Sequence, residues 1–339
     1  MKYKLNESPV ITTNGFNMNS ITLDLNIPNN FDFHDYKITN IDDIKIKENN
    51  KFISDIGLTH NKYLNINIDK NNYQSEELNK IEYFFKQGDN LIDSINISAN
   101  NKTNINMLIN YESIDNLENF HNGKINISAD GNSTVNLTII NRLNKFSTNI
   151  IDINTTSKNE SNIIINLIDV GGDKRVYRNQ SITSEKSNNE INTIYIGKDK
   201  DIIDICFNYI NDEVESVNNI EVEGLLYDNA RKHFKGIIDF KSGAKKSVGK
   251  ENENCLLLSN DAISRSLPIL LCGEEDVDGA HSVSSGMIDK DKLFYLQSRG
   301  ISETDAKKLI IKADFQKVLS KVPESIKDKL NELIDGEII

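Results

Sequence analysis

The chain has 339 residues, a formal net charge of −12 and a sequence pI near 5.0. A surface this acidic repels phosphate backbones, which argues against nucleic acid as a partner, although an acidic balance is also ordinary for cytosolic proteins. No uncharged apolar run approaches the roughly 20 residues needed to span a bilayer. The first residues also lack the apolar core of a secretory signal. We therefore expect a cytoplasmic protein with no membrane partner.

The first 89 residues predict a mixed N-terminal cap region. Strand-like pieces run from Ile21 to Ile27 and from Tyr63 to Ile68. They precede a segment, Ser75 to Gln87, that we interpret as a helix because Glu76 and Glu77 would stand in its favourable first turn.

Residues 90–288 predict a body made of short strands. Apolar and polar residues alternate in runs such as Ser94–Ser98, Lys124–Ser128 and Thr134–Ile140, and turn residues separate the runs. Almost no helical period intervenes. Many strands without helical crossovers are typical of a sandwich, a barrel or a solenoid, and pattern alone favours a solenoid only weakly.

Residues 289–339 predict three helices. The first runs from Asp289 to a helix-ending Gly300, and we expect its Phe294 to face the core. Ser302 is placed to cap the second helix, with Asp305 three residues on. The predicted buried face of the second helix consists of Ala306, Leu309, Ile310 and Ala313. After Pro323, the predicted apolar face of the last helix consists of Ile326, Leu330, Leu333 and Ile334.

The sequence indicates no nucleotide site of its own. Gly243–Lys250 resembles a phosphate loop, but its glycine spacing is one residue too long, and Glu251 stands where Ser or Thr is required. We interpret this segment as a basic turn. No dinucleotide-binding G-x-G-x-x-G is present, so nothing in the sequence indicates a flavin.

An ordered series of motifs fills the last third of the chain. It comprises Phe234–Phe240, Leu256–Ala262, Leu267–Leu270, Gly279–Gly286 and Leu293–Ile301. In order and spacing the series resembles the core signature of the SufB/SufD family, and the resemblance extends over roughly residues 115–323. SufB carries Glu where this chain has Ser282, so the likeness is to a SufD-like or simplified SufBD type.

The resemblance implies both a fold and a function. The fold is mainly β, a right-handed parallel β-helix with a helical C-terminal segment. The function is that of a non-catalytic scaffold subunit on which an iron–sulfur cluster is assembled transiently. Its partners would be a SufC-type ABC ATPase, which docks on the C-terminal helices and supplies ATP hydrolysis, and a second β-helix subunit. That subunit is either another copy of this chain or a SufB/SufD sibling, paired through the β-helix ends.

Three side chains are candidate transient ligands for iron or the cluster, because thiolates and imidazoles suit iron. His281 occupies the family's signature position. Cys272 precedes it by nine residues, and successive coils could bring the two together. Cys255 opens an apolar run, where a shift of one residue would turn it to the other face. For each cysteine the alternative is a buried core residue; for His281 it is a hydrogen-bonded structural residue. Cys206 is interpreted as core, and the odd cysteine count with no CxxC pair predicts reduced thiols.

Four residues near the tail are candidates for the ATPase dock. They are Leu293, Tyr295, Arg299 and Ser302. The alternative is that the apolar members only pack the helix onto the β body.

Two other functions remain open at the level of sequence. One is a purely structural partner that stabilises a SufB-type scaffold. The other is a carbohydrate-binding or carbohydrate-active β-solenoid, against which the specific tail and the missing export signal both argue.

Overall fold

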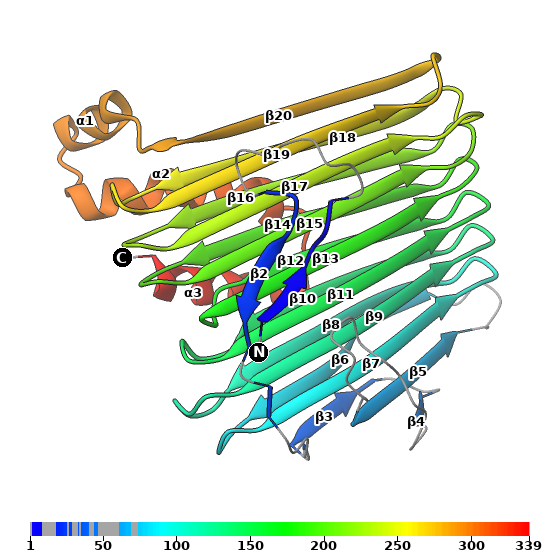
Figure 1. The fold of residues 1–339 in the computed structure, drawn as a ribbon, viewed down its shortest axis with the longest axis horizontal. Helices are drawn as coiled ribbons and strands as arrows, with labels where there is room; N and C mark the ends of the chain where they lie inside the picture. Colours follow the sequence, from blue (N-terminus) through cyan, green and yellow to red (C-terminus); the bar gives the residue numbers. More distant parts are fainter. Residues whose placement is uncertain are drawn as a thin grey trace.

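The computed structural model describes residues 2–8, 18–25, 27–28, 33, 35–40, 44–46, 61–68 and 74–338. Two sheets of nine strands run through this part of the chain (Figure 1). Sheet 1 consists, in spatial order, of β20 (Val277–Met287), β18 (Ser247–Leu257), β16 (Val217–Leu226), β14 (Asn188–Gly197), β12 (Asn162–Asp169), β10 (Thr134–Arg142), β8 (Asn104–Ser113), β6 (Gln74–Phe85) and β3 (Tyr36–Thr39). Sheet 2 consists of β19 (Ile263–Cys272), β17 (Arg231–Phe240), β15 (Ile202–Asn211), β13 (Lys174–Thr183), β11 (Thr148–Ser157), β9 (Phe120–Ala129), β7 (Asn90–Ala99), β5 (Lys62–Ile68) and β4 (Ile44–Ile46).

The chain enters the two sheets alternately, which makes the fold a parallel β-solenoid. From β5 onward, each strand pairs in parallel with the strand two places further along the chain, so one coil consists of one strand from each sheet. The register of sheet 1 stacks Ile139 directly between Ile109 and Leu167. The solenoid implied by the family resemblance is thus confirmed. It decides between the sandwich, the barrel and the solenoid that the alternation of apolar and polar residues had left open.

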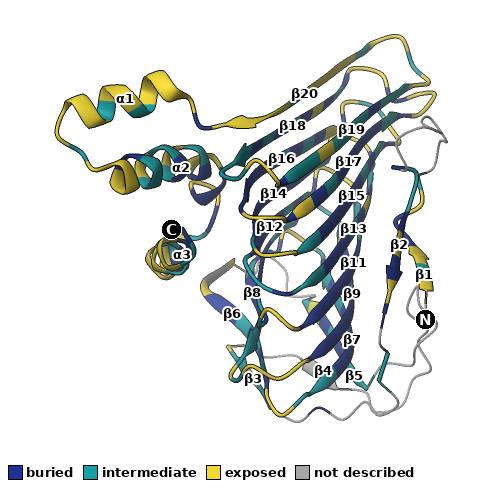
Figure 2. Ribbon diagram, turned by 60° about the vertical axis from the view of Figure 1, so that its left-hand side comes forward, coloured by how far each residue is buried: buried dark blue, intermediate teal, exposed yellow. Residues whose placement is uncertain are grey.

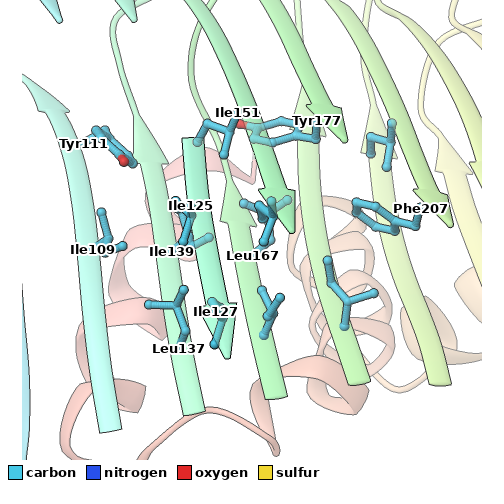
Figure 3. Packing of buried hydrophobic residues seen from close by; sticks show 14 of the residues in the cluster. Ile109, Tyr111, Ile125, Ile127, Leu137, Ile139, Ile151, Leu167, Tyr177 and Phe207 are labelled. Carbon is cyan, nitrogen blue, oxygen red and sulfur yellow. The ribbon is translucent and has the colours of Figure 1, made fainter. Parts of the chain in front are cut away.

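The core lies between the sheets and is made of side chains from alternate positions. In β10, for example, Val135, Leu137 and Ile139 are fully buried. Figure 3 shows such residues meeting across the interior from neighbouring coils. Each coil within the stack buries its inner face against the coils on both sides, as expected for a solenoid.

The helix expected over Ser75–Gln87 is wrong, because all of this segment up to Phe85 lies in β6 (Gln74–Phe85) and its last two residues follow the strand. Ile81, Tyr83 and Phe85 alternate with less buried residues and join the core between the sheets. Acidic residues at the start of the segment suggested a helix, but the period-2 pattern and pairing with β8 and β3 decide the outcome.

Three helices follow the last strand, as predicted: α1 (Lys290–Ser298), α2 (Glu303–Leu319) and α3 (Glu324–Glu337). Helices α2 and α3 pack on the outer face of sheet 1 (Figure 2). Two ion pairs tie α2 to that sheet, Lys317–Glu223 at 2.5 Å and Lys321–Glu190 at 3.1 Å. None of the helices in the described ranges is long and apolar enough to cross a membrane.

The buried face of α2 differs from the predicted one. Ala306 is buried, but Leu309 and Ala313 are exposed and Ile310 is half-buried. The helix instead buries Ile311, Phe315, Val318 and Leu319. The predicted face of α3 is confirmed for Ile326, Leu330 and Ile334, whereas Leu333 is half-buried.

A hairpin of β1 (Lys2–Leu5) and β2 (Ile21–Asp24) covers part of the outer face of sheet 2. Leu5, Leu23 and Leu25 pack there against Ile150 and Val176.

The Gly243–Lys250 segment is a turn that runs directly into β18, and no helix follows it. The segment thus contains the predicted turn, and the absence of a nucleotide site stays a prediction.

Candidate functional site

The solenoid ends in a coil whose interior is uncovered. Its two strands, β19 and β20, pair only with β17 and β18 among the described strands. No residue of β20 is buried, and β19 buries only Ile269. Register with the strands beneath shows which residues of this coil face the interior. These residues, which we call the open end, are Ser264, Ser266, Pro268, Leu270, Cys272, Val277, Gly279, His281, Val283, Ser285 and Met287.

Two of the predicted ligands lie at the open end. His281 is exposed in the middle of β20 and is in register with Glu251 of β18. Cys272 is exposed at the end of β19 and is in register with the core residue Phe240. The alternative that Cys272 is a buried core residue is therefore wrong, since the residue is exposed and none of the described strands covers it.

The third predicted ligand, Cys255, is fully buried one coil below. It belongs to the core between the sheets and is in register with Gly224 and Ser285. Burial raises the pKa of its thiol, although the nearby Lys232 ammonium acts in the opposite direction. Because the thiolate is the form that binds metals, this environment disfavours metal binding by Cys255 in the structure as it stands.

The structure does not assemble the three candidates into one cluster. Across the residues it describes, no group of three or more His, Cys, Asp and Glu side chains is arranged to hold a metal ion. His281 and Cys272 thus share the open end as separate exposed side chains.

Sequence reasoning missed a group of buried charges just beneath the open end. The Lys232 ammonium, fully buried, pairs with the Glu253 carboxylate and donates to Ser266 Oγ at 2.8 Å. Ser266 Oγ donates to Glu253 Oε2 at 2.6 Å, and Tyr195 donates to Glu253 Oε1 at 3.3 Å. Nothing in the sequence around Lys232 distinguishes it from a solvated lysine.

A second buried carboxylate, Glu251, lies on the same strand as Glu253. It is 3% exposed, and neither of its carboxylate oxygens has a hydrogen-bond partner. Burial, followed by repulsion from Glu253, raises its pKa to about 8. The only sign of this residue in the sequence was that it breaks the phosphate-loop pattern.

The predicted dock on α1 is exposed. The helix buries none of its residues and projects from the β body (Figure 2). Phe294 is 72% exposed and Tyr295 is 57% exposed, so the expectation that Phe294 faces the core is wrong. Leu293 is half-buried. The Arg299 guanidinium lies 5.3 Å from the centre of the Tyr295 ring. This cation–π contact covers part of the ring.

Ser302 caps α2 as predicted. Its Oγ accepts a hydrogen bond from the Asp305 backbone N–H at 3.1 Å and donates to the Asp305 carboxylate at 2.6 Å. This role accounts for Ser302 structurally, and its part in partner binding stays a prediction.

Fold and site together define a parallel β-solenoid protein with an open end at its last coil and a solvent-exposed helix beside it. Residues 84–314, more than half of the chain, match the family described as SUF system FeS cluster assembly, SufBD core domain. The chain belongs to this family.

Several curated proteins are similar to the chain. It is 31% identical over 147 residues to the iron–sulfur cluster assembly protein SufD of Bacillus subtilis, covering 43% of this chain and 34% of that protein. It is 36% identical over 89 residues to SufD of Escherichia coli, covering 26% of this chain and 21% of that protein. It is 33% identical over 92 residues to a SufBD family protein of Pyrococcus horikoshii, covering 27% of this chain and 21% of that protein. The chain thus matches about a third or less of the length of these relatives.

Proposed function

We propose that this protein is a non-catalytic scaffold subunit for iron–sulfur cluster assembly, and that a SufC-type ABC ATPase binds it through α1. The observation that carries the proposal is the exposure of Phe294 and Tyr295 on a helix that buries nothing. Adjacent exposed aromatic residues on a soluble protein are typical of an interaction site. Membership of the SufBD family supports a partner of the SUF system.

The open end is the proposed surface for pairing with a second subunit. Strand β20 presents an edge that pairs with none of the described strands, and Met287 is 51% exposed on its inward side. An unpaired edge and an uncovered interior both favour coverage by another chain. The partner would be a second copy of this chain or a SufB/SufD sibling.

The same surface would hold the cluster transiently, with His281 and Cys272 as iron ligands. Both are exposed, and their positions at the open end would place the cluster between the paired subunits. Helices α2 and α3 connect the proposed ATPase dock to sheet 1, so movement of the ATPase could change access to this surface. Cys255 would bind iron only after the interior of the solenoid opens, because its side chain is fully buried.

The ATPase dock is tested by the double substitution Phe294→Ser and Tyr295→Ser. We expect it to weaken binding of the SufC-type ATPase encoded by the same organism at least tenfold, since anchors of this type contribute about 2 kcal/mol or more each. Co-purification and titration calorimetry measure the effect. Removing residues 290–339 is a poorer test, because it also strips α2 and α3 from sheet 1.

The matched control is Phe146→Ser. Phe146 is 50% exposed in the turn between β10 and β11. The Phe146→Ser substitution should leave binding of the ATPase unchanged. Equal binding by the double variant and the wild type would refute α1 as the dock.

A purely structural partner is the second candidate, favoured by the absence of a ligand cluster among the described residues. It predicts that His281→Ala leaves cluster assembly unchanged in a complex that still forms.

A further inference from the structure

The carboxylate of Glu251 is buried without a partner. Its side chain is 3% exposed, and both oxygens lack a hydrogen bond. The carboxylate reaches across the interior to Gly236, where a Cβ would lie 2.3 Å from Cδ and Oε1. Gly236 therefore leaves the space that the carboxylate fills. An isolated carboxylate removed from water costs several kcal/mol or more.

No neighbouring cation in the described structure offsets the cost of ionising this carboxyl group. Lys232 is the buried ammonium of this coil, and it is bound to Glu253 and Ser266. Lys235, also buried, donates to the backbone carbonyl of Asn6 on the outer side of sheet 2. Glu251 thus has two carboxyl oxygens that no group in the described structure uses, and no cation there stabilises its ionised form.

His281 lies one coil above Glu251, at the open end. The two residues are in register in the parallel ladder of β18 and β20. Side chains in register on adjacent parallel strands point to the same side of the sheet, with strands about 4.8 Å apart. The exposed imidazole and the buried carboxylate therefore stand one above the other along the solenoid interior.

We propose that Glu251 and His281 together bind a divalent iron ion at the open end of the solenoid. A carboxylate oxygen and an imidazole nitrogen are ligands that Fe²⁺ accepts. Binding of the ion would displace the carboxyl proton of Glu251 to solvent and stabilise the ionised carboxylate, and water or the paired subunit would complete the coordination of the ion. Glu251 is thereby assigned as an iron ligand beneath His281. The inference rests on the proposed function only for the choice of iron as the metal.

The test is anaerobic titration of the full chain with Fe²⁺ alone, followed by calorimetry and thermal unfolding. We expect the wild type to bind Fe²⁺ and to melt at a higher temperature when the ion is present, because a ligand that binds only the folded state stabilises it. Glu251→Gln should weaken binding at least about tenfold, as loss of a ligand costs no less than loss of an outer-shell partner. His281→Asn should weaken binding similarly.

Glu275→Gln is the matched control. It removes one exposed carboxylate from the turn before β20 and should bind Fe²⁺ as the wild type does. In the presence of chelator, Glu251→Gln should melt at or above the wild-type temperature, since it removes a buried carboxyl group that has no partner in the metal-free protein. That result shows that the variant is folded.

Wild-type affinity in Glu251→Gln, or no Fe²⁺ binding by the wild type, would overturn the assignment. Weakened binding in Glu275→Gln equal to that in Glu251→Gln would overturn it as well, since the loss would then reflect net charge. ATPase binding through α1 is measured separately and without iron. Failure of the iron site and failure of the proposed scaffold role can therefore be told apart.

Discussion

Arg175→Met is expected to lower the free energy of unfolding by about 3–5 kcal/mol near pH 8, the usual cost of leaving a buried charge without its partner. Arg175 is fully buried in β13. It donates to Asp169 Oδ2 at 3.1 Å and to Asp201 Oδ2 at 2.8 Å. Urea denaturation followed by circular dichroism measures the loss.

The loss should shrink as the pH falls. Burial raises the pKa of Asp169 even with Arg175 present, and burial raises the pKa of Asp201 to about 6. Removing the guanidinium raises both further. A carboxyl group whose folded-state pKa exceeds its unfolded value of about 3.9 contributes stability at low pH that is lost as pH rises through the folded pKa. The variant should therefore be closest to the wild type near pH 4 to 5.

Arg178→Met is the matched control in the same strand. Arg178 is 38% exposed in the side chain and pairs with Asp152 at 3.0 Å. A half-exposed pair of this type contributes about 0–1 kcal/mol. Equal losses in the two variants, or a loss at Arg175 that does not change with pH, would show that the buried network does not have the assigned role.

Phe315→Ala is expected to cost about 3–5 kcal/mol, as truncation of a buried aromatic side chain usually does. Phe315 is 1% exposed in α2 and lies in the cluster that joins α2 and α3 to sheet 1. Leu309→Ala, six residues earlier on the same helix, should cost less than about 1 kcal/mol, because Leu309 is 49% exposed. Denaturant unfolding of both variants measures the difference.

This pair of variants also decides between the helix face predicted from sequence and the face seen in the structure. A large loss for Leu309→Ala together with a small loss for Phe315→Ala would mean that α2 packs by the face inferred from sequence. That result would contradict the packing described above.

Local sequence signals predicted several elements correctly. Alternation in Thr134–Ile140 predicted β10, and Ser302 with Asp305 predicted the start of α2. Gly300 has a φ of +86°, as a helix-ending glycine requires. These features depend on a few neighbouring residues, so they can be read without knowledge of the tertiary contacts.

The wrong predictions concern features that depend on tertiary contacts and not on neighbouring residues alone. Phe294 is apolar on a short helix, but α1 has no surface of the β body beneath it. Which face of α2 is buried depends on the residues of sheet 1 that it meets, and these are far away in the sequence. In the segment Gln74–Phe85, pairing with β8 outweighed local helix signals.

The site was predictable only in part. The family motif identified His281, and an open end of the solenoid explains why it is exposed. The buried groups beneath it could not be predicted, because Lys232, Glu251 and Glu253 look like surface residues until the register places them inside the coil. A one-residue shift in register would have turned each of them to solvent.

The most direct test of the scaffold role is anaerobic reconstitution with iron and sulfide. The protein is supplied in complex with the SufC-type ATPase of its own organism and with its SufB/SufD sibling, where one exists. The account predicts that the wild-type complex acquires the visible absorption of an iron–sulfur cluster and that His281→Ala loses most of it while the complex still forms. A wild-type complex that gains no cluster, or a His281→Ala complex that gains as much as the wild type, would contradict the account.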